Sequence, residues 1–323
     1  MQLFGKKAKS KGRVGLMINE DSIAIAYLES RRGEPRLISC QNLALESAGS
    51  AGKMLEKLVR QMNLEGEQCS YVLNPRDYNL LLVEAPNVEP EELRSAVRWK
   101  IKDLLDMKVE DAAIDTFPVP EDAYRGRKMV YVVAVLKSRI KSIVEMVDGS
   151  GMELAIIDIP ELAMKNYSSL LIEDSQGVAF MDLRRTGSTM NITRNGDLYL
   201  TRRINTQLDP DVMDSPEWPS LKDRLVLEIQ RSLDYYESQL GGGQITRIVI
   251  AQRHHDTAGM AKTLDELLAA QVMSLNLADY LQSDVPLTSE LQQLAMAPIG
   301  ACLRDMKKPE ALELPDPNEQ EAA

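Results

Sequence analysis

The alternation of apolar and polar positions opens twice in the same way along the chain. Each opening is an apolar strand, a polar turn, a second strand, a glycine-containing turn and a third strand, a pattern typical of antiparallel strands. The first copy begins at Val14–Ile18 and turns at Gly33, and the second begins at Val178–Asp182 and turns at Asn195-Gly196. The repeat predicts a duplicated α/β unit with two lobes, in which the first turn of each copy faces the cleft between them.

Helical and strand patterns between the two openings predict a small module inserted into the first lobe. A helix over Ala51–Met62 and two short strands come first. A helix beginning near Pro90, two strands, a second helix capped by Ser138 and a strand at Glu153–Ile157 follow, and we assign residues 86–158 to the module. The first of its helices has an apolar stripe that we expect to be buried, namely Leu93, Ala96, Val97, Ile101, Leu104 and Leu105.

The second half of the chain predicts the other lobe and a return to the first. A long helix over Leu221–Leu240 ends at three glycines, and the β-branched segment Ile245–Ala251 is typical of a strand buried on both faces. The predicted organisation is therefore a basic start (1–12), a first lobe (13–174), a second lobe (175–304) whose closing helix (290–304) returns to the first lobe, and a disordered acidic tail (305–323).

Composition narrows the class of protein. The net charge of −11 and the pI near 4.9 argue against nucleic-acid binding, which needs a concentrated basic face. No apolar stretch is long enough to span a bilayer, and three scattered cysteines fit a reducing compartment. We expect a soluble cytoplasmic protein. Its basic start is either a solvated terminus or a weak contact with an anionic membrane surface.

Several local strings resemble one branch of a known superfamily. They are Leu3-Phe4-Gly5-Lys6-Lys7, the helix from Glu91 through Lys100 with the following strand at Ile114-Asp115, the stretch from Glu228 to Tyr236, and the stretch from Pro298 to Arg304. With the duplicated layout, they resemble the actin-like ATPase superfamily, and within it the PilM branch of type IV pilus assembly proteins, including those of mannose-sensitive haemagglutinin (MSHA) pili. The resemblance covers nearly the whole folded chain and implies an FtsA-like fold with an inserted module in the first lobe.

The resemblance also implies a partner. PilM-like proteins are cytoplasmic platforms that bind the N-terminal tail of a PilN-like protein, which crosses the inner membrane once, so this chain would associate peripherally through that partner. We expect the tail to lie between the inserted module and the first lobe, with Arg98, Trp99, Lys102 and Tyr131 as contacts. Trp99 falls opposite the apolar stripe of its helix, where it is either an exposed anchor or covered by the first lobe.

The loops that hold nucleotide phosphates in this superfamily are altered here. Close approach to phosphate needs glycine or small residues. The family's Asp-x-Gly is replaced by Met17-Ile18-Asn19, followed by two carboxylates, and the second loop keeps Asp182 but continues through Arg184 and Arg185. We expect no certain cofactor, and ATP with Mg²⁺ to bind weakly if at all. The residues that would hold it are Asn19, Asp182, Thr186, Gly187, Ser188, Glu228, Arg231 and Ser232.

Three functions remain open from the sequence. The favoured one is a non-catalytic scaffold of pilus assembly, because nothing in the altered loops positions both magnesium and an attacking water. The alternative is a working ATPase of the same machine, in which Glu228 and Arg231 hold the adenosine instead of forming a surface ion pair. A small-molecule kinase of the sugar-kinase type is the third. His254 and His255 are adjacent and lack other ligands at suitable spacing, so no metal site is predicted.

Overall fold

The structure is a computed structural model of the 323-residue chain. It describes residues 12–31, 33–170, 176–184, 188–206, 208–209, 211–252 and 256–304. The expectations for the basic start before Gly12 and for the acidic tail, and those for Thr186, Gly187, His254 and His255, lie outside the described residues.

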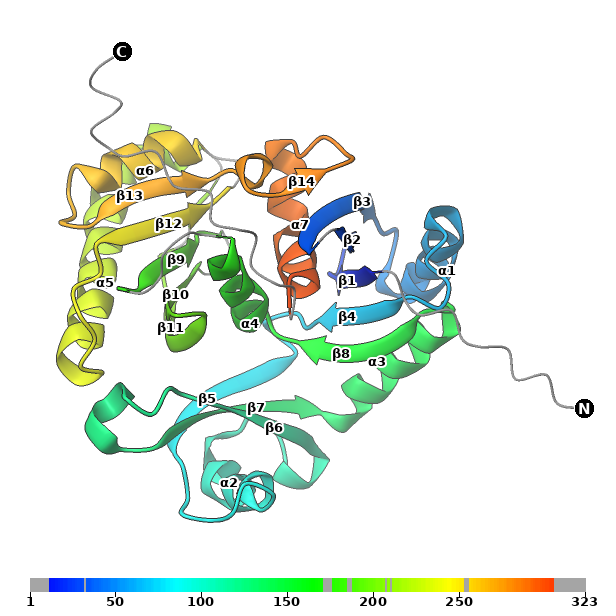
Figure 1. The fold of residues 1–323 in the computed structure, drawn as a ribbon, viewed down its shortest axis with the longest axis horizontal. Coiled ribbons are helices and arrows are strands. Elements are labelled where there is room, and N and C mark those ends of the chain that lie inside the picture. Colours follow the sequence, from blue (N-terminus) through cyan, green and yellow to red (C-terminus); the bar gives the residue numbers. More distant parts are fainter. Residues whose placement is uncertain are drawn as a thin grey trace, which may run out of the picture.

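Two sheets form the centres of the two lobes (Figure 1). The first lobe has the strand order β14-β3-β2-β1-β4-β8, and the second has β11-β10-β9-β12-β13. In each sheet three antiparallel strands are followed by parallel ones, which confirms the predicted duplication. The strands of the first sheet are β1 (Gly12–Ile18), β2 (Ser22–Arg31), β3 (Glu34–Ala44), β4 (Gln68–Val72), β8 (Glu153–Asp158) and β14 (Gln282–Ser283). Those of the second are β9 (Val178–Asp182), β10 (Ser188–Arg194), β11 (Asp197–Ile204), β12 (Arg247–Ala251) and β13 (Gln271–Leu275).

Local sequence explains the tight turn in the second lobe. Asn195 and Gly196 both adopt left-handed backbone conformations, with φ of 53° and 81°. A two-residue hairpin turn of this kind favours Asn-Gly because few other residues tolerate positive φ at both positions. The turn sets the register that pairs Arg194 with Asp197.

Helices cover the two sheets. The α-helices are α1 (Ala51–Met62), α2 (Leu93–Ile101), α3 (Lys137–Gly149), α4 (Pro160–Lys165), α5 (Trp218–Gln239), α6 (Thr257–Asp265) and α7 (Ser289–Cys302). Short 3₁₀ turns are η1 (Ala48–Ser50), η2 (Lys102–Leu104), η3 (Val109–Asp111), η4 (Ala123–Gly126), η5 (Asn166–Ser169), η6 (Val212–Asp214) and η7 (Leu277–Asp279). The predicted helix ended by three glycines is α5, and its stripe residues Leu225, Ile229 and Tyr236 are buried.

The inserted module is smaller than predicted and begins earlier. Its sheet has the order β5-β7-β6, with β5 (Tyr78–Glu84), β6 (Ala112–Pro118) and β7 (Met129–Leu136). The predicted range 86–158 is therefore wrong at both ends, because β5 pairs with β7, whereas β8 pairs with β4 of the first lobe. Helix α3 also belongs to the first lobe, where Ile143 and Val147 share a core with residues of α1.

Two details of the helices that were predicted for the module also differ from expectation. In α2, Val97 and Ile101 are buried, but Leu104 is 56% exposed, because the chain tightens into η2 and turns this side chain outward. Ser138 does not cap α3, since the helix begins at Lys137 with Leu136 as the preceding residue. The first error comes from extending an ideal helical periodicity past the end of α2, and the second from placing the start of α3 too late in the chain.

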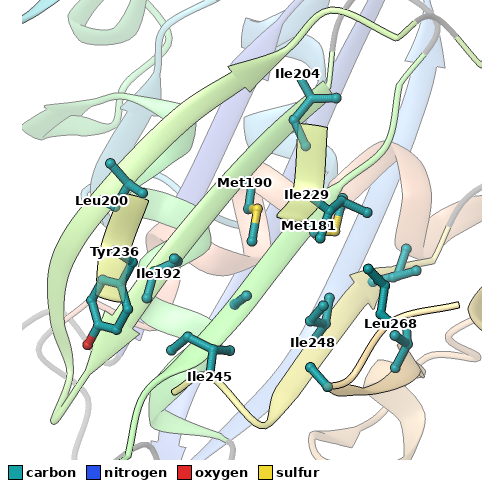
Figure 2. Close-up of a cluster of buried hydrophobic side chains, with 14 of the residues drawn as sticks. Met181, Met190, Ile192, Leu200, Ile204, Ile229, Tyr236, Ile245, Ile248 and Leu268 are labelled. Carbon is teal, nitrogen blue, oxygen red and sulfur yellow. The ribbon is translucent and has the colours of Figure 1, made fainter. Parts of the chain in front are cut away.

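Each lobe has an apolar core of its own, and a third core around α7 joins residues of both lobes, among them Leu28 and Phe180. In the second lobe, side chains of the sheet meet those of α5 and α6, among them Met181, Ile192 and Ile229 (Figure 2). In the first lobe, β1 and β2 pack against α1 and α3 through residues such as Leu16 and Leu58.

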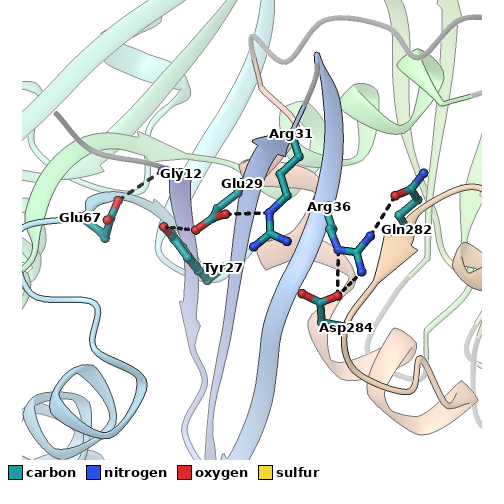
Figure 3. A network of polar contacts seen from close by, with 8 residues as sticks. All are labelled: Gly12, Tyr27, Glu29, Arg31, Arg36, Glu67, Gln282 and Asp284. Atoms are coloured by element: carbon teal, nitrogen blue, oxygen red, sulfur yellow. Dashed lines mark hydrogen bonds and ion pairs between the residues drawn. The ribbon is translucent and has the colours of Figure 1, made fainter.

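The chain returns from the second lobe to the first, as predicted, but it also adds a strand that the sequence did not indicate. Strand β14 pairs with the edge strand β3, where Arg36 donates to the Asp284 carboxylate and to the Gln282 side chain (Figure 3). Helix α7 then packs so closely on β1 that a Cβ on Gly15 would lie 1.9 Å from the carbonyl oxygen of Pro298.

Candidate functional site

A cleft of about 670 Å³ lies between the two lobes. It is lined by the turn after β1, the turn after β4, α4, the ends of β9 and β11, and α7. Of the predicted nucleotide-site residues that the structure describes, Asn19 and Asp182 line this cleft together. The carboxylates of Glu20 and Asp21 line it as well, which would place negative charge beside any phosphate.

The first loop of the cleft satisfies its own polar groups. The Asn19 backbone N–H donates to the Ser22 carbonyl (2.8 Å), and its side-chain amide donates to Ser22 Oγ (3.3 Å). Its side-chain oxygen accepts from the Asn74 amide (3.2 Å), and Glu20 pairs with Arg76 (2.7 Å). Met17 stands where the resemblance implies a metal-side carboxylate, and it is 9% exposed. The loop is therefore a closed hydrogen-bonded turn.

The second loop places a guanidinium on the carboxylate it retains. Arg184 Nε lies 3.3 Å from Asp182 Oδ2, and the Asp182 side chain is only 8% exposed. Magnesium requires nearly ideal octahedral oxygen ligands, and a carboxylate already paired with arginine is a poor one. Ser188 is fully buried, and its Oγ accepts from the Arg184 backbone N–H (3.0 Å). Its hydroxyl faces the protein instead of the cleft, which corrects its prediction as a ligand.

The predicted adenosine residues lie on α5 away from the residues that line the cleft. Glu228 accepts from the backbone N–H of Asn205 (2.9 Å), and it does not pair with Arg231. Arg231 is exposed, and its carbonyl oxygen lies 3.5 Å from the Arg202 guanidinium. Ser232 is buried and donates to the Glu228 carbonyl (2.7 Å). Ser232 is thus a helix-internal side chain, which corrects its prediction as a nucleotide contact.

A second cavity of about 440 Å³ lies where the inserted module meets the first lobe. It is lined by the start of β5, the segment after η2, the end of β7 and the first turns of α3. We call it the module groove, and its lining is Arg76, Asp77, Tyr78, Asn79, Asp106, Met107, Leu136, Ser138, Arg139 and Ser142. The sequence-based expectation for the partner pointed to this junction.

The walls of the module groove are held by polar contacts. Arg139 bridges to Asp77 (2.9 Å) and donates to the Tyr71 hydroxyl (3.4 Å). Tyr78 donates to Glu161 of α4 (2.5 Å), and burial together with this carboxylate raises the pKa of the Tyr78 phenol well above its ordinary value. Burial also raises the pKa of Tyr71 to about 12. Both phenols are therefore neutral: Tyr78 donates to Glu161, and Tyr71 accepts from Arg139.

The predicted partner contacts do not line this groove. Trp99 is 70% exposed on α2, so the first lobe does not cover it, and Lys102 of the same face is exposed as well. Arg98 is half-buried and donates to the carbonyls of Val109 (2.5 Å) and Ala112 (3.4 Å), so its guanidinium stabilises the module.

Tyr131 is the clearest correction among the partner contacts. It is 2% exposed, stacks on Phe117 with ring centroids 5.0 Å apart, and accepts from the Thr201 N–H (3.1 Å). Its burial raises its pKa to about 12. Tyr131 therefore joins the module to the second lobe and is not accessible to a partner.

Sequence reasoning identified Arg184 but missed two other arginines that line the cleft, and it missed most residues of the module groove. Arg76 and Arg203 line the cleft, and Asp77 and Arg139 line the groove, although they lie far apart in the chain. No local sequence motif links the residues of each pair, so their proximity can be recognised only from the folded structure. Within the described ranges, no cluster of three His, Cys, Asp or Glu residues is suited to a metal ion, and no helix has the length and apolar content needed to span a membrane.

Comparison with known proteins finds similar structures but no similar sequences. No protein-family model matches the sequence, and no curated protein sequence matches it. Among solved structures, the chain is similar to the PilM-PilN type IV pilus biogenesis complex, with a TM-score of 0.69, 16% identity, and 93% of this chain and 98% of that chain covered.

Two further structures are more distant. The cytoplasmic domain of EpsL, an inner membrane component of the type II secretion system of Vibrio cholerae, has a TM-score of 0.49 at 11% identity, covering 88% of this chain and 94% of that one. A Bacteroides thetaiotaomicron protein with an actin-like ATPase fold and unknown function has a TM-score of 0.49 at 9% identity, covering 89% and 96%. The duplicated sheets and the similarity to the PilM-PilN structure confirm the two-lobed fold that the sequence predicts.

Proposed function

We propose that this protein is a non-catalytic, actin-like scaffold that holds the cytoplasmic N-terminal tail of a PilN-like, single-span inner-membrane protein in a type IV pilus assembly machine. The observation that carries the proposal is the contrast between the two cavities. In the interlobe cleft, of about 670 Å³, the groups that would face a nucleotide phosphate are held in internal contacts such as Asp182–Arg184. The module groove, of about 440 Å³, instead combines exposed apolar surface at Leu136 with polar side chains.

The chemistry of the module groove suits an extended peptide. Met107 and Leu136 offer apolar surface, and Leu136 is 41% exposed. Asn79, Ser138 and Ser142 add side chains that donate and accept hydrogen bonds, as peptide groups require. Pockets that combine apolar walls with a few polar groups bind ligands specifically.

The exposed face of α2 adjoins this groove along the chain. The segment from Lys102 leads through η2 to Asp106 and Met107, which form part of the groove lining. Trp99 and Lys102 are therefore proposed to contact residues of the partner that flank the part held in the groove. In this arrangement the protein would sit at the cytoplasmic face of the inner membrane through its partner.

The type of pilus that the machine assembles is a more specific part of the proposal. The strings quoted above resemble MshI-like proteins of MSHA pili, so we propose an MSHA-type machine. The structural similarity to a PilM-PilN complex supports a protein of this general kind.

Calorimetric titration with a synthetic peptide tests the proposal. The peptide is the N-terminal tail of the PilN-like protein encoded in the same genome. We expect micromolar binding to the wild-type chain and at least a tenfold loss with Ser142→Arg, which fills the groove. Val144→Asp is the matched control on α3, because Val144 is exposed and lies outside the groove lining. Absence of binding to the wild-type chain, or equal affinity in Ser142→Arg, contradicts the proposal.

Trp99→Ala tests the second contact separately. We expect a smaller loss of affinity, about threefold to tenfold, because an exposed aromatic anchor loses its contact area without closing the groove. If Trp99→Ala binds the tail as tightly as wild type while Ser142→Arg does not, the result supports binding in the module groove and shows that the exposed face of α2 does not contact the tail.

A further inference from the structure

The inserted module is anchored at two ends that belong to different lobes. Both chain connections of the module come from the first lobe, through β4 to β5 and through β7 to α3. Its far end, the connection between β6 and β7, lies below α5 of the second lobe (Figure 1). We call residues 119–128 of this connection the clasp.

Apolar side chains of the clasp are part of the second-lobe core. Val119, Ala123 and Tyr124 are 6%, 0% and 3% exposed, and they belong to the same buried cluster as Tyr199 and Tyr236 of the second lobe. Because these side chains leave water only when the clasp is docked, apolar burial favours the docked arrangement.

Polar contacts of the clasp converge on the same surface. The Asp122 carboxylate pairs with Arg194 and accepts from the Tyr199 hydroxyl (2.8 Å). Arg194 lies over the Tyr199 ring, 4.4 Å from its centroid. On the other side, Arg125 donates to the carbonyl oxygen of Ser238 at the end of α5 (2.8 Å). The clasp therefore holds β10, β11 and α5 at once.

The backbone of the clasp is in a conformation that isolated chains disfavour. Tyr124, Arg125 and Gly126 have φ of 56°, 50° and 85° in succession. Two consecutive non-glycine residues in the left-handed region are strained, and such strain persists only where surrounding contacts determine it. The docked shape of the clasp thus depends on the second lobe, and undocking releases the strain.

This arrangement gives the two lobes a connection that does not pass through the cleft. We infer that the clasp fixes the separation of the two lobes by latching the inserted module to the second lobe, and that undocking of the clasp lets the lobes move apart. A ligand that bridges both walls of a cleft holds the two lobes of a protein together. The clasp would hold the lobes of this chain together in the same way without a nucleotide.

Distance measurement between spin labels tests this inference. Labels are placed at Lys57→Cys on α1 and Lys262→Cys on α6, both exposed, in the full chain. The three native cysteines are buried and do not take up label in the folded protein. Two variants remove the latch: Asp122→Ala/Arg125→Ala, which deletes exposed polar contacts, and Tyr124→Ala, which deletes the buried anchor. Asp115→Ala is the control: Asp115 lies on β6 of the same module, and its exposed carboxylate pairs with Arg94 of α2 and accepts from the Thr116 backbone N–H, both within the module.

We expect one narrow interlobe distance in the wild-type chain and in Asp115→Ala, and a broader distribution with a longer mean in both latch variants. Circular dichroism establishes that each labelled chain is folded. If Tyr124→Ala fails to fold, the surface double variant decides the question. A distribution in Asp122→Ala/Arg125→Ala that overlays that of wild type overturns the inference.

Discussion

At the scale of single residues, the hydrogen bond between Tyr78 and Glu161 joins the module groove to helix α4. Tyr78→Phe removes the donor to a carboxylate and leaves Glu161 without this partner, which we expect to lower the free energy of unfolding by about 2 kcal/mol. Urea denaturation measures the loss. Tyr280→Phe is the control, because Tyr280 is only partly buried, and its effect should stay within about 0.5 kcal/mol. Equal effects of the two substitutions would show that the bond contributes nothing specific.

Asp158 is the residue from which we expect a pH dependence. Its side chain is 1% exposed, and burial raises its pKa above the ordinary value, although Arg304 (3.1 Å) and the Ile159 N–H (2.9 Å) oppose the rise. Between the unfolded pKa of about 3.9 and the higher folded pKa, the folded chain binds more protons than the unfolded chain. The free energy of unfolding therefore falls as pH rises through that window.

Comparison with Asp158→Asn isolates this contribution. The variant cannot titrate, so the difference in unfolding free energy, wild type minus variant, should decrease as the pH is raised from about 4 toward neutrality. Urea titrations at several pH values measure it. A difference that is constant or increases with pH is incompatible with a raised pKa at Asp158.

At the scale of elements, strands with strong apolar patterns were predicted well, and connections between sheets were not. The strand pairs around Gly33 and Asn195-Gly196 follow from local turn chemistry, which the sequence contains. The assignment of β5 to the module and of β8 to the first lobe depends on which partner strand each one meets. Pairing partners are distant in sequence, so periodicity within one segment carries no information about them.

Helix α7 offers a prediction about how two elements approach each other. Gly15→Ala places a methyl group within 1.9 Å of the Pro298 carbonyl oxygen and 2.6 Å of its carbon, both backbone atoms, so β1 and α7 must separate. We expect a loss of about 3 kcal/mol in unfolding free energy. Gly52→Ala on α1 is the matched control, since its new methyl group meets only Met146 Cγ at 4.0 Å, and it should stabilise by about 0.5 kcal/mol. Loss of similar size in both variants would contradict the packing argument.

At the scale of the whole molecule, the sequence predicted the cleft but only part of what lines it. Asn19 and Asp182 were found because each lies at the end of a recognisable strand that opens a repeat: Asn19 follows β1, and Asp182 is the last residue of β9. Arg76 and Arg203 were missed because their approach to the cleft follows from the closure of two lobes around it. Tyr131 was misplaced for the same reason, since its burial comes from the second lobe and not from its own strand.

The state of the cleft leads to a prediction for the intact protein in the presence of nucleotide. A ligand at one hundred times its Kd stabilises a folded protein by about 2.7 kcal/mol, which raises the melting temperature by several degrees. Arg184 is paired with the Asp182 carboxylate, and the loop at Asn19 is closed by its own hydrogen bonds. We therefore expect Mg-ATP at millimolar concentration to leave the melting temperature unchanged within about 1 °C. The tail peptide of the PilN-like partner should raise it in the same assay. A rise of several degrees with Mg-ATP that disappears in Asp182→Ala would instead establish a nucleotide site in the cleft, and would favour the ATPase alternative over the scaffold.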